Sequence, residues 1–159
     1  MTIIIEGANA TGKTTLSIAL SRALQFRVNK LPRARTFVDQ NRLYELVETL
    51  LATNSPVILD RVPFISDLIY PNPPTATTIE LAQSLIKKYN PIIIYCRIPP
   101  ETAYTSYINR KHTKEDFSFA VYDLYDRLMA NIKHIKYDYT TDDLHTLINT
   151  VIEEIKYND

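Results

Sequence analysis

Both glycines of this 159-residue chain lie within one short segment, residues 7–14, whose sequence is GANATGKT. The spacing G-x-x-x-x-G-K-[ST] is typical of a loop whose backbone N–H groups surround phosphate oxygens. In such a loop the lysine reaches the terminal phosphates, and the hydroxyl that follows it binds Mg²⁺. The motif therefore predicts a set of phosphate-binding residues: Gly7, Ala8, Asn9, Ala10, Thr11, Gly12, Lys13, Thr14 and Thr15.

The sequence on either side of this segment agrees with the prediction. Residues 2–6 form an apolar, β-branched run that predicts a buried strand, and residues 13–24 carry apolar side chains at helical spacing. A loop between a strand and a helix N-terminus holds anions where the free N–H groups and the helix dipole favour them. The alternative is a glycine turn that binds nothing.

The rest of the chain alternates between apolar runs and helical stripes. Strands are expected at 26–31, 57–60, 91–97 and 134–139, and helices at 38–52, 78–89, 100–111 and 117–132, with a last helix that follows a capping box at 140–143 and ends near 157. This alternation predicts an α/β fold, a three-layer α/β/α arrangement around a five-stranded parallel sheet. We expect one domain over residues 1–159, with ligands bound beyond the carboxyl ends of the strands.

Composition narrows the classes of partner. Eighteen basic and eighteen acidic residues cancel, so no overall field attracts nucleic acid, and a nucleic-acid partner is disfavoured. The single cysteine, Cys96, lies in an apolar run and is expected to be a buried thiol, which suits a reducing compartment. No apolar stretch approaches the ~18 residues that span a bilayer. We expect a cytoplasmic protein without a membrane partner, and the sequence leaves a homodimer open.

A second motif follows the predicted strand at 57–60. Asp60 ends this strand, where a carboxylate that organises Mg²⁺ belongs, and Arg61 offers a planar fork for a phosphate. The alternative is an ion pair at the surface. Ser66 and Tyr70 lie further along the same segment.

Together the two motifs resemble those of the thymidylate kinase and deoxynucleoside kinase superfamily. Glu6-Gly7 leading into Gly12-Lys13-Thr14-Thr15 is similar to the start of these P-loop kinases, and Asp60-Arg61 with Ser66 and Tyr70 is similar to the Asp-Arg-(aromatic)…Ser…Tyr segment of thymidylate kinases. Pro63 and the extra residue before Ser66 resemble short, phage-encoded thymidylate kinase-like proteins.

This resemblance implies an enzyme that transfers a phosphoryl group from ATP with Mg²⁺. It implies catalytic roles for Lys13, Asp60, Arg61 and Arg110, and metal binding by Thr14 and Asp60. Arg61, Ser66 and Tyr70 would bind the acceptor. A short helical lid at about 108–118 would bring Arg110 over the transferring phosphate, although a solvated helix end is the alternative for this arginine.

The chain departs from the family at several positions. Asn9 replaces an acidic residue, Ala10 replaces a third loop glycine, and residues 31–35 (LPRAR) replace the pattern Arg-Glu-Pro-Gly-Gly. The absence of a glutamate base there and the presence of Arg33 and Arg35 favour an acceptor that already carries a phosphate. The leading expectation is a deoxynucleoside monophosphate kinase that converts dTMP to dTDP. The alternatives are a deoxynucleoside kinase, a kinase of a nucleic-acid end or modified base, and a degenerate nucleotide-binding module without turnover.

Overall fold

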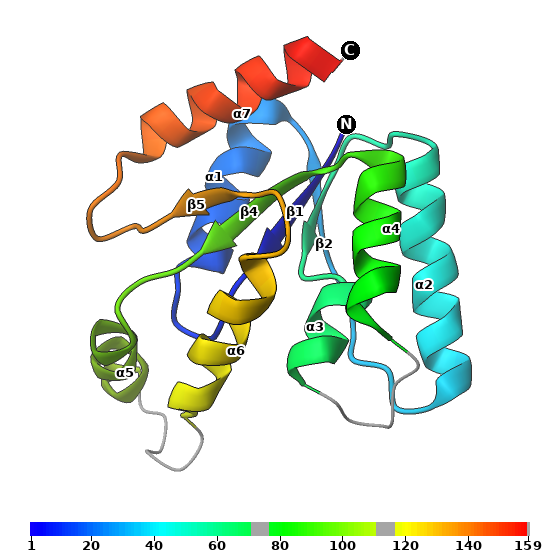
Figure 1. Cartoon of the computed structure of the whole chain (residues 1–159). Helices are drawn as coiled ribbons and strands as arrows, with labels where there is room; N and C mark the ends of the chain where they lie inside the picture. Colours follow the sequence, from blue (N-terminus) through cyan, green and yellow to red (C-terminus); the bar gives the residue numbers. More distant parts are fainter. Residues whose placement is uncertain (71–76, 111–116, 159) are drawn as a thin grey trace.

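The computed structural model describes residues 1–70, 77–110 and 117–158, and the strands and helices within them are drawn in Figure 1. The strands are β1 (Thr2–Glu6), β2 (Arg27–Lys30), β3 (Val57–Asp60), β4 (Ile92–Cys96) and β5 (Ile135–Tyr137). The helices are α1 (Lys13–Leu24), α2 (Phe37–Ala52), α3 (Pro63–Ile69), α4 (Ile79–Tyr89), α5 (Pro100–Asn109), α6 (Phe119–Met129) and α7 (Leu144–Asn158).

All five strands belong to one parallel sheet with the order β2-β3-β1-β4-β5. The central strand β1 lies between β3 and β4, with Ile5 opposite Asp60 on one side and opposite Ile94 on the other. The predicted parallel sheet is therefore confirmed. Because the strands are parallel, the loops after β1, β2 and β3 all begin at the same edge of the sheet, where ligands bind in folds of this kind.

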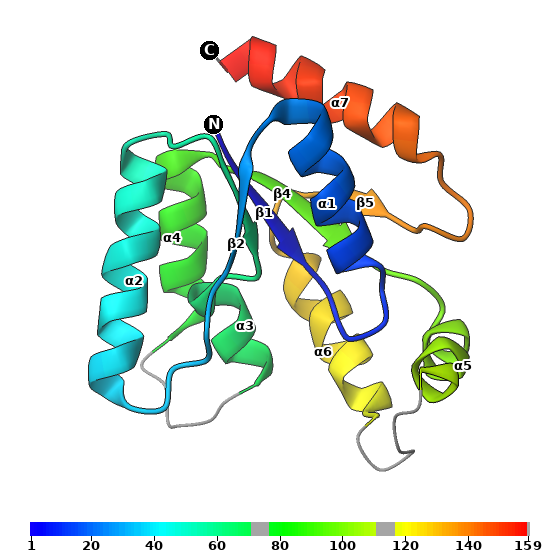
Figure 2. The ribbon, with the colours of Figure 1, turned by 180° about the vertical axis from the view of Figure 1, so that it is seen from behind.

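Helices cover both faces of the sheet. Alternate side chains of a strand point to opposite faces, so Ile3 and Ile5 of β1 pack with residues of α1 and α7, whereas Ile4 packs with residues of α2, α3, α4 and α6. Figure 2 shows α1 and α7 from the face that they cover. These two cores confirm the predicted three-layer α/β/α architecture.

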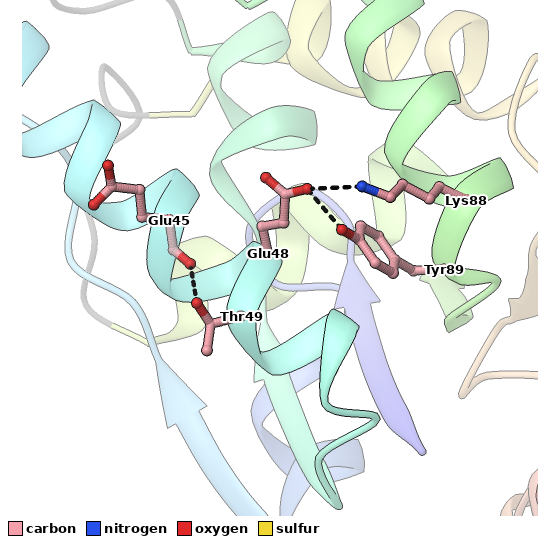
Figure 3. A network of polar contacts seen from close by, with 5 residues as sticks. All are labelled: Glu45, Glu48, Thr49, Lys88 and Tyr89. Atoms are coloured by element: carbon pink, nitrogen blue, oxygen red, sulfur yellow. Dashed lines mark hydrogen bonds and ion pairs between the residues drawn. The ribbon is translucent and has the colours of Figure 1, made fainter.

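Polar contacts join two helices of the same layer, α2 and α4 (Figure 3). Oε1 of Glu48 in α2 accepts hydrogen bonds from the Tyr89 hydroxyl at 2.7 Å and from Lys88 Nζ at 3.4 Å, both in α4. Within α2, Thr49 Oγ1 donates to the Glu45 carbonyl oxygen at 2.7 Å. These side chains line none of the pockets described below, so Lys88 is suited to serve as a control position.

The structure corrects several details of the sequence prediction. Helix α3 was not expected: its first residue is Pro63, whose fixed φ and missing N–H suit the first helical position. The expected capping box at 140–143 is replaced by a single cap, because Asp143 Oδ2 accepts from the backbone N–H of Thr146 at 2.8 Å. Strands β2 and β5 and helix α6 are shorter than expected.

Two expectations remain predictions. The lid expected at 108–118 falls largely on residues 111–116, which lie outside the described part of the chain. The described residues of this range are the end of α5 with Arg110, and Phe117 and Ser118 before α6. The single domain over 1–159 likewise stays a prediction. Among the described residues, no helix combines the length and the apolar character needed to cross a bilayer.

Candidate functional site

The loop between β1 and α1 needs glycine at both positions where the sequence has it. Gly7 has a φ of 148°, and a Cβ atom there would lie 2.4 Å from the carbonyl oxygen of Cys96. Gly12 has a φ of 84°, and a Cβ atom there would lie 2.7 Å from Cδ1 of Tyr139. Both the backbone conformation and the close neighbours therefore exclude a side chain.

Hydrogen bonds to one carbonyl group close the loop on itself. Thr11 Oγ1 donates to the Ala8 carbonyl oxygen at 2.8 Å, and Lys13 Nζ donates to the same oxygen at 2.6 Å. Burial and, to a smaller extent, the nearby Arg61 lower the pKa of Lys13 to about 8, against the opposing effect of Asp60. A bound polyphosphate would restore the full positive charge of this lysine, since anionic oxygens stabilise the ammonium form.

A cavity of about 170 Å³ lies over the loop, and we call it the phosphate pocket. Its walls combine the loop with the ends of β2, β3 and α5. The lining residues are Asn9, Ala10, Thr11, Gly12, Lys13, Thr14, Thr15, Lys30, Asp60, Arg61 and Arg110. The structure thus brings together most of the predicted phosphate-binding residues and all four predicted catalytic residues, whereas Gly7 and Ala8 are buried behind the pocket.

The Thr14 hydroxyl and the Asp60 carboxylate both line the phosphate pocket, and oxygen atoms of these kinds suit Mg²⁺. In the described part of the chain, no three His, Cys, Asp or Glu side chains gather into a metal cage. A magnesium ion held by Thr14 and Asp60 would therefore depend on phosphate oxygens and water for its other ligands, which is the usual arrangement for this ion.

Arg61 lies between the loop and the region beyond β3. Its backbone is left-handed, with a φ of 68°, and its N–H donates to the Ile5 carbonyl oxygen at 2.9 Å. Its Nη2 atom donates to the Gly7 carbonyl oxygen and to Asn9 Oδ1, each at 3.1 Å. Asn9, a departure from the family pattern, therefore holds this arginine. The Arg61 Nε atom is buried and has no hydrogen-bond partner among the described residues.

A larger cavity of about 350 Å³ opens beside the phosphate pocket, and we call it the acceptor pocket. It is lined by Lys30, Leu31, Pro32, Arg33, Ala34, Leu43, Asp60, Arg61, Val62, Pro63, Ser66, Asp67 and Tyr70. The two pockets share Lys30, Asp60 and Arg61.

Predicted acceptor-binding residues surround this cavity. The guanidinium carbons of Arg33 and Arg61 lie 4.6 and 5.2 Å from the centroid of the Tyr70 ring, within range of a cation–π interaction. Ser66 Oγ is buried without a hydrogen-bond partner in the described part of the chain. Arg35, in contrast, lines neither pocket. The structure therefore groups four of the five predicted acceptor residues and leaves Arg35 outside.

Burial raises the pKa of two carboxyl groups in this region, those of Asp67 and Glu6. Asp67 Oδ2 accepts from Gln40 Nε2 at 2.8 Å, and burial raises the pKa of Asp67 against the effects of Gln40 and Arg33. Glu6, at the end of β1, is fully buried, and burial raises its pKa to about 7. Its Oε1 accepts from the Val62 N–H at 2.7 Å and its Oε2 from the Tyr125 hydroxyl at 3.0 Å.

A third cavity, of about 160 Å³, lies on the other side of Gly12, and we call it the side pocket. It is lined by Gly12, Thr15, Leu16, Arg110, Tyr137, Tyr139 and Leu144. Gly12, Thr15 and Arg110 line both the side pocket and the phosphate pocket, so a ligand can extend from one into the other.

Sequence reasoning missed several residues of the site. Lys30 ends β2 at the edge of the sheet where Asp60 ends β3, and the rule that found Asp60 would have found it. Tyr139 follows β5 at the same edge, and Glu6 was noted only as part of a resemblance. Asp67 carried no signal of its own, because its place depends on helix α3. Tyr122 and Tyr125 of α6 are buried in the core.

Comparisons with known proteins bear on the fold. Scans of protein-family models and of curated protein sequences gave no match. Among solved structures, the YorR protein of Bacillus subtilis, in complex with phosphorylated GDP, is similar with a TM-score of 0.78 at 18% identity, over 99% of this chain and 97% of that one. A deoxyadenosine kinase from M. mycoides with the products dCMP and dCDP bound has a TM-score of 0.58 at 18% identity and is covered over 100% of both chains.

A gluconokinase from Sinorhizobium meliloti is also similar, with a TM-score of 0.57 at 12% identity, over 99% of this chain and 97% of that one. These proteins include kinases named for different acceptors, and identities below 20% show a shared fold rather than a shared substrate. The chain therefore has the P-loop kinase fold, as its phosphate loop and parallel sheet predict.

Proposed function

We propose that this protein transfers the γ-phosphoryl group of ATP to a deoxynucleoside monophosphate, with dTMP as the leading acceptor. The observation that carries the proposal is that the phosphate pocket and the acceptor pocket share Lys30, Asp60 and Arg61. A donor phosphate over the loop and an acceptor in the larger cavity would then meet at these three side chains. Direct transfer between two bound molecules needs this adjacency.

The donor phosphates would lie over residues 9–15, with Lys13 neutralising charge that develops on the transferring group. Mg²⁺, held by Thr14 and Asp60, would supply further charge stabilisation. Arg110 lines both the phosphate pocket and the side pocket, which suits a cation that approaches the transferring phosphate. The aromatic walls of the side pocket, Tyr137 and Tyr139, suit the base of the donor nucleotide.

A phosphate group on the acceptor would explain why three cationic side chains line the acceptor pocket. Lys30, Arg33 and Arg61 all line it, and arginine pairs with phosphate through parallel hydrogen bonds. The buried, unpartnered Nε of Arg61 and Oγ of Ser66 are groups that a polar ligand would satisfy. A volume of about 350 Å³ lies in the range of small-molecule sites, which agrees with a nucleotide acceptor and disfavours a polymer.

A panel of nucleosides and nucleoside monophosphates, with coupled detection of ADP, tests this proposal. We expect turnover with dTMP to exceed turnover with thymidine at least tenfold, and Lys13→Ala to remove it. Turnover with thymidine and none with dTMP would reverse the assignment. Transfer of labelled phosphate to an oligonucleotide would replace it with a nucleic-acid kinase. Thermal stabilisation by ATP–Mg²⁺ without turnover of any acceptor would indicate a nucleotide-binding module.

A deoxynucleoside kinase is the second candidate, and Asp60 is the observation that favours it. A hydroxyl acceptor needs a base near the point of transfer, and the Asp60 carboxylate lies where the two pockets meet. If Asp60 acts as this base rather than as a metal ligand, Asp60→Asn will abolish turnover of nucleosides while ATP–Mg²⁺ binding persists. Calorimetry with ATP and Mg²⁺ distinguishes the two roles, because loss of a metal ligand also weakens binding of the complex.

A further inference from the structure

Glu6 is a buried carboxylate to which neither motif assigns a role. Its side chain has no exposed surface and lines none of the three pockets. Burying an ionisable group in such a place costs free energy of folding unless its oxygens are hydrogen-bonded. Both oxygens of Glu6 accept such bonds, from the Val62 N–H and from the Tyr125 hydroxyl.

We propose that Glu6 is a positioning residue for Arg61: its carboxylate holds the turn at Arg61–Val62 and so fixes the arginine between the phosphate pocket and the acceptor pocket. The inference rests on the proposed function, in which Arg61 binds the acceptor's phosphate. Glu6 itself would touch neither substrate.

The backbone at Arg61 needs to be held. A left-handed conformation, here with a φ of 68°, is unfavourable for a residue that carries a Cβ atom. Hydrogen bonds on both sides of the residue maintain it. The Arg61 N–H donates to the Ile5 carbonyl oxygen at 2.9 Å, and the next N–H, that of Val62, donates to Glu6 Oε1 at 2.7 Å. The neighbours Ile5 and Glu6 of β1 therefore clamp two successive residues.

The same clamp fixes the start of α3. Val62 is the N-cap of this helix, and its carbonyl oxygen accepts from the N–H of Ser66 at 2.9 Å. Ser66 and Tyr70, two of the other predicted acceptor residues, lie on α3 and directly after it. One buried carboxylate thus sets the place of the arginine and of the helix that forms the opposite wall of its cavity.

A carboxylate serves this purpose better than an amide. It offers two acceptor oxygens, and both are used here, whereas a glutamine would offer one acceptor and one donor. Arg61 and Lys13 also favour its ionised form and offset part of the rise in pKa that burial causes. The second donor, the Tyr125 hydroxyl, connects the carboxylate to α6 and prevents it from turning away.

A double-mutant cycle with Glu6→Gln and Arg61→Ala tests the inference. Alone, Glu6→Gln should lower kcat/KM for the acceptor at least about tenfold, since small misplacements of a binding group have effects of this size. Binding of ATP–Mg²⁺, measured by calorimetry, should change less than threefold. In the Arg61→Ala background, Glu6→Gln should have a much smaller effect, because the arginine through which it mainly acts is already missing and only the placement of α3 is still disturbed.

Tyr95→Phe is the matched control. Tyr95 is another buried tyrosine of the same core, next to Glu6 in the sheet and stacked on the Tyr125 ring, but its hydroxyl donates to Asp126 Oδ1 at 2.7 Å and not to Glu6. Its loss should lower Tm but leave kcat/KM for the acceptor unchanged. Effects of Glu6→Gln and Arg61→Ala that multiply would overturn the inference. So would a Glu6→Gln variant that, like this control, loses only thermal stability.

One measurement does not need turnover, so it separates this inference from the proposed function. The NMR signal of the Arg61 Nε–H group reports the place of the guanidinium. We expect Glu6→Gln to shift this signal and Tyr95→Phe to leave it in place. If the wild-type protein phosphorylates no acceptor but the signal shifts as expected, the proposed function fails and the positioning role stands. If Glu6→Gln does not shift the Arg61 signal, the positioning role is contradicted, whether or not the protein is active.

Discussion

The phosphate pocket and the acceptor pocket lie at the same edge of the sheet but are built differently. Most of the phosphate pocket comes from the contiguous residues 9–15, and its shape depends on the backbone. The acceptor pocket is lined by residues 30–34, 43, 60–63, 66, 67 and 70, which meet only after the sheet and α3 have formed. The phosphate pocket therefore depends mainly on local structure, whereas the acceptor pocket depends on the tertiary fold.

This difference suggests a division of labour. A loop made of backbone N–H groups binds phosphate in any P-loop protein, since every residue supplies the same donor. The side chains of the second pocket can vary without disturbing the sheet, so they are where the choice of acceptor resides. Arg61 belongs to both regions, because it donates to Gly7 and Asn9 of the loop and lies near the Tyr70 ring.

The largest effect is expected in the phosphate pocket, from Lys13→Ala. Removal of the ammonium group takes away charge stabilisation in the transition state, and turnover should fall at least about 10²–10³-fold. The change removes one hydrogen bond to the Ala8 carbonyl oxygen, so the fold should survive with a small change in Tm. Coupled detection of ADP gives the rate, and Lys88→Ala, far from the pockets, is the control. A variant that keeps a tenth of the wild-type rate would contradict this role.

Arg61→Ala should have the next largest effect, and this effect should be much larger for the acceptor than for ATP. We expect kcat/KM for the acceptor to fall about 100-fold, because a charge-assisted contact and its orientation are both lost. KM for ATP should change far less, since the loop keeps its own hydrogen bonds. Steady-state kinetics with each substrate varied in turn measures both quantities. Equal losses on the two sides would show that Arg61 serves the phosphate loop as much as the acceptor pocket.

Arg33→Ala and Arg35→Ala form a matched pair that isolates the acceptor pocket. Both arginines lie in the loop after β2, but only Arg33 lines the cavity and lies over the Tyr70 ring. Arg33→Ala should raise KM for the acceptor about tenfold, the worth of one charge-assisted hydrogen bond. Arg35→Ala should leave it unchanged. A rise in KM with Arg35→Ala of similar size would mean that the loop after β2 binds the acceptor in another conformation.

The same contrast explains what could be predicted from the sequence. The order of strands and helices follows from local patterns, namely β-branched runs and helical spacing. The phosphate loop follows from Gly7, Gly12 and the Lys13-Thr14 pair after them. Asp60 and Arg61 were found because parallel strands end at one edge. Each of these inferences needs a few neighbouring residues or one topological rule.

What could not be predicted depends on distant segments. Nothing local distinguishes Arg33 from Arg35, and the path of the chain after β2 decides which of them enters the cavity. Glu6 lies 56 residues from the amide that it holds, and no local pattern announces such a contact. Helix α3 was missed because its seven residues are too few for a helical stripe to be recognised.

The smallest effect returns to the phosphate loop and tests its backbone alone. Ala10 stands where many of the kinases that this loop resembles have glycine. Its φ is 60°, a left-handed conformation that disfavours a Cβ atom. Ala10→Gly should therefore raise Tm, by about 2–4 °C for each kcal/mol of strain relieved, although the loss of a partly buried methyl group offsets part of the gain. Ala8→Gly is the control in the same loop: Ala8 is buried and has no positive φ, so its replacement should lower Tm. Thermal unfolding of the two variants gives the comparison. A decrease in Tm for both would mean that the methyl group of Ala10 matters more than the strain in its backbone, and that the loop owes its shape to packing as well as to backbone conformation.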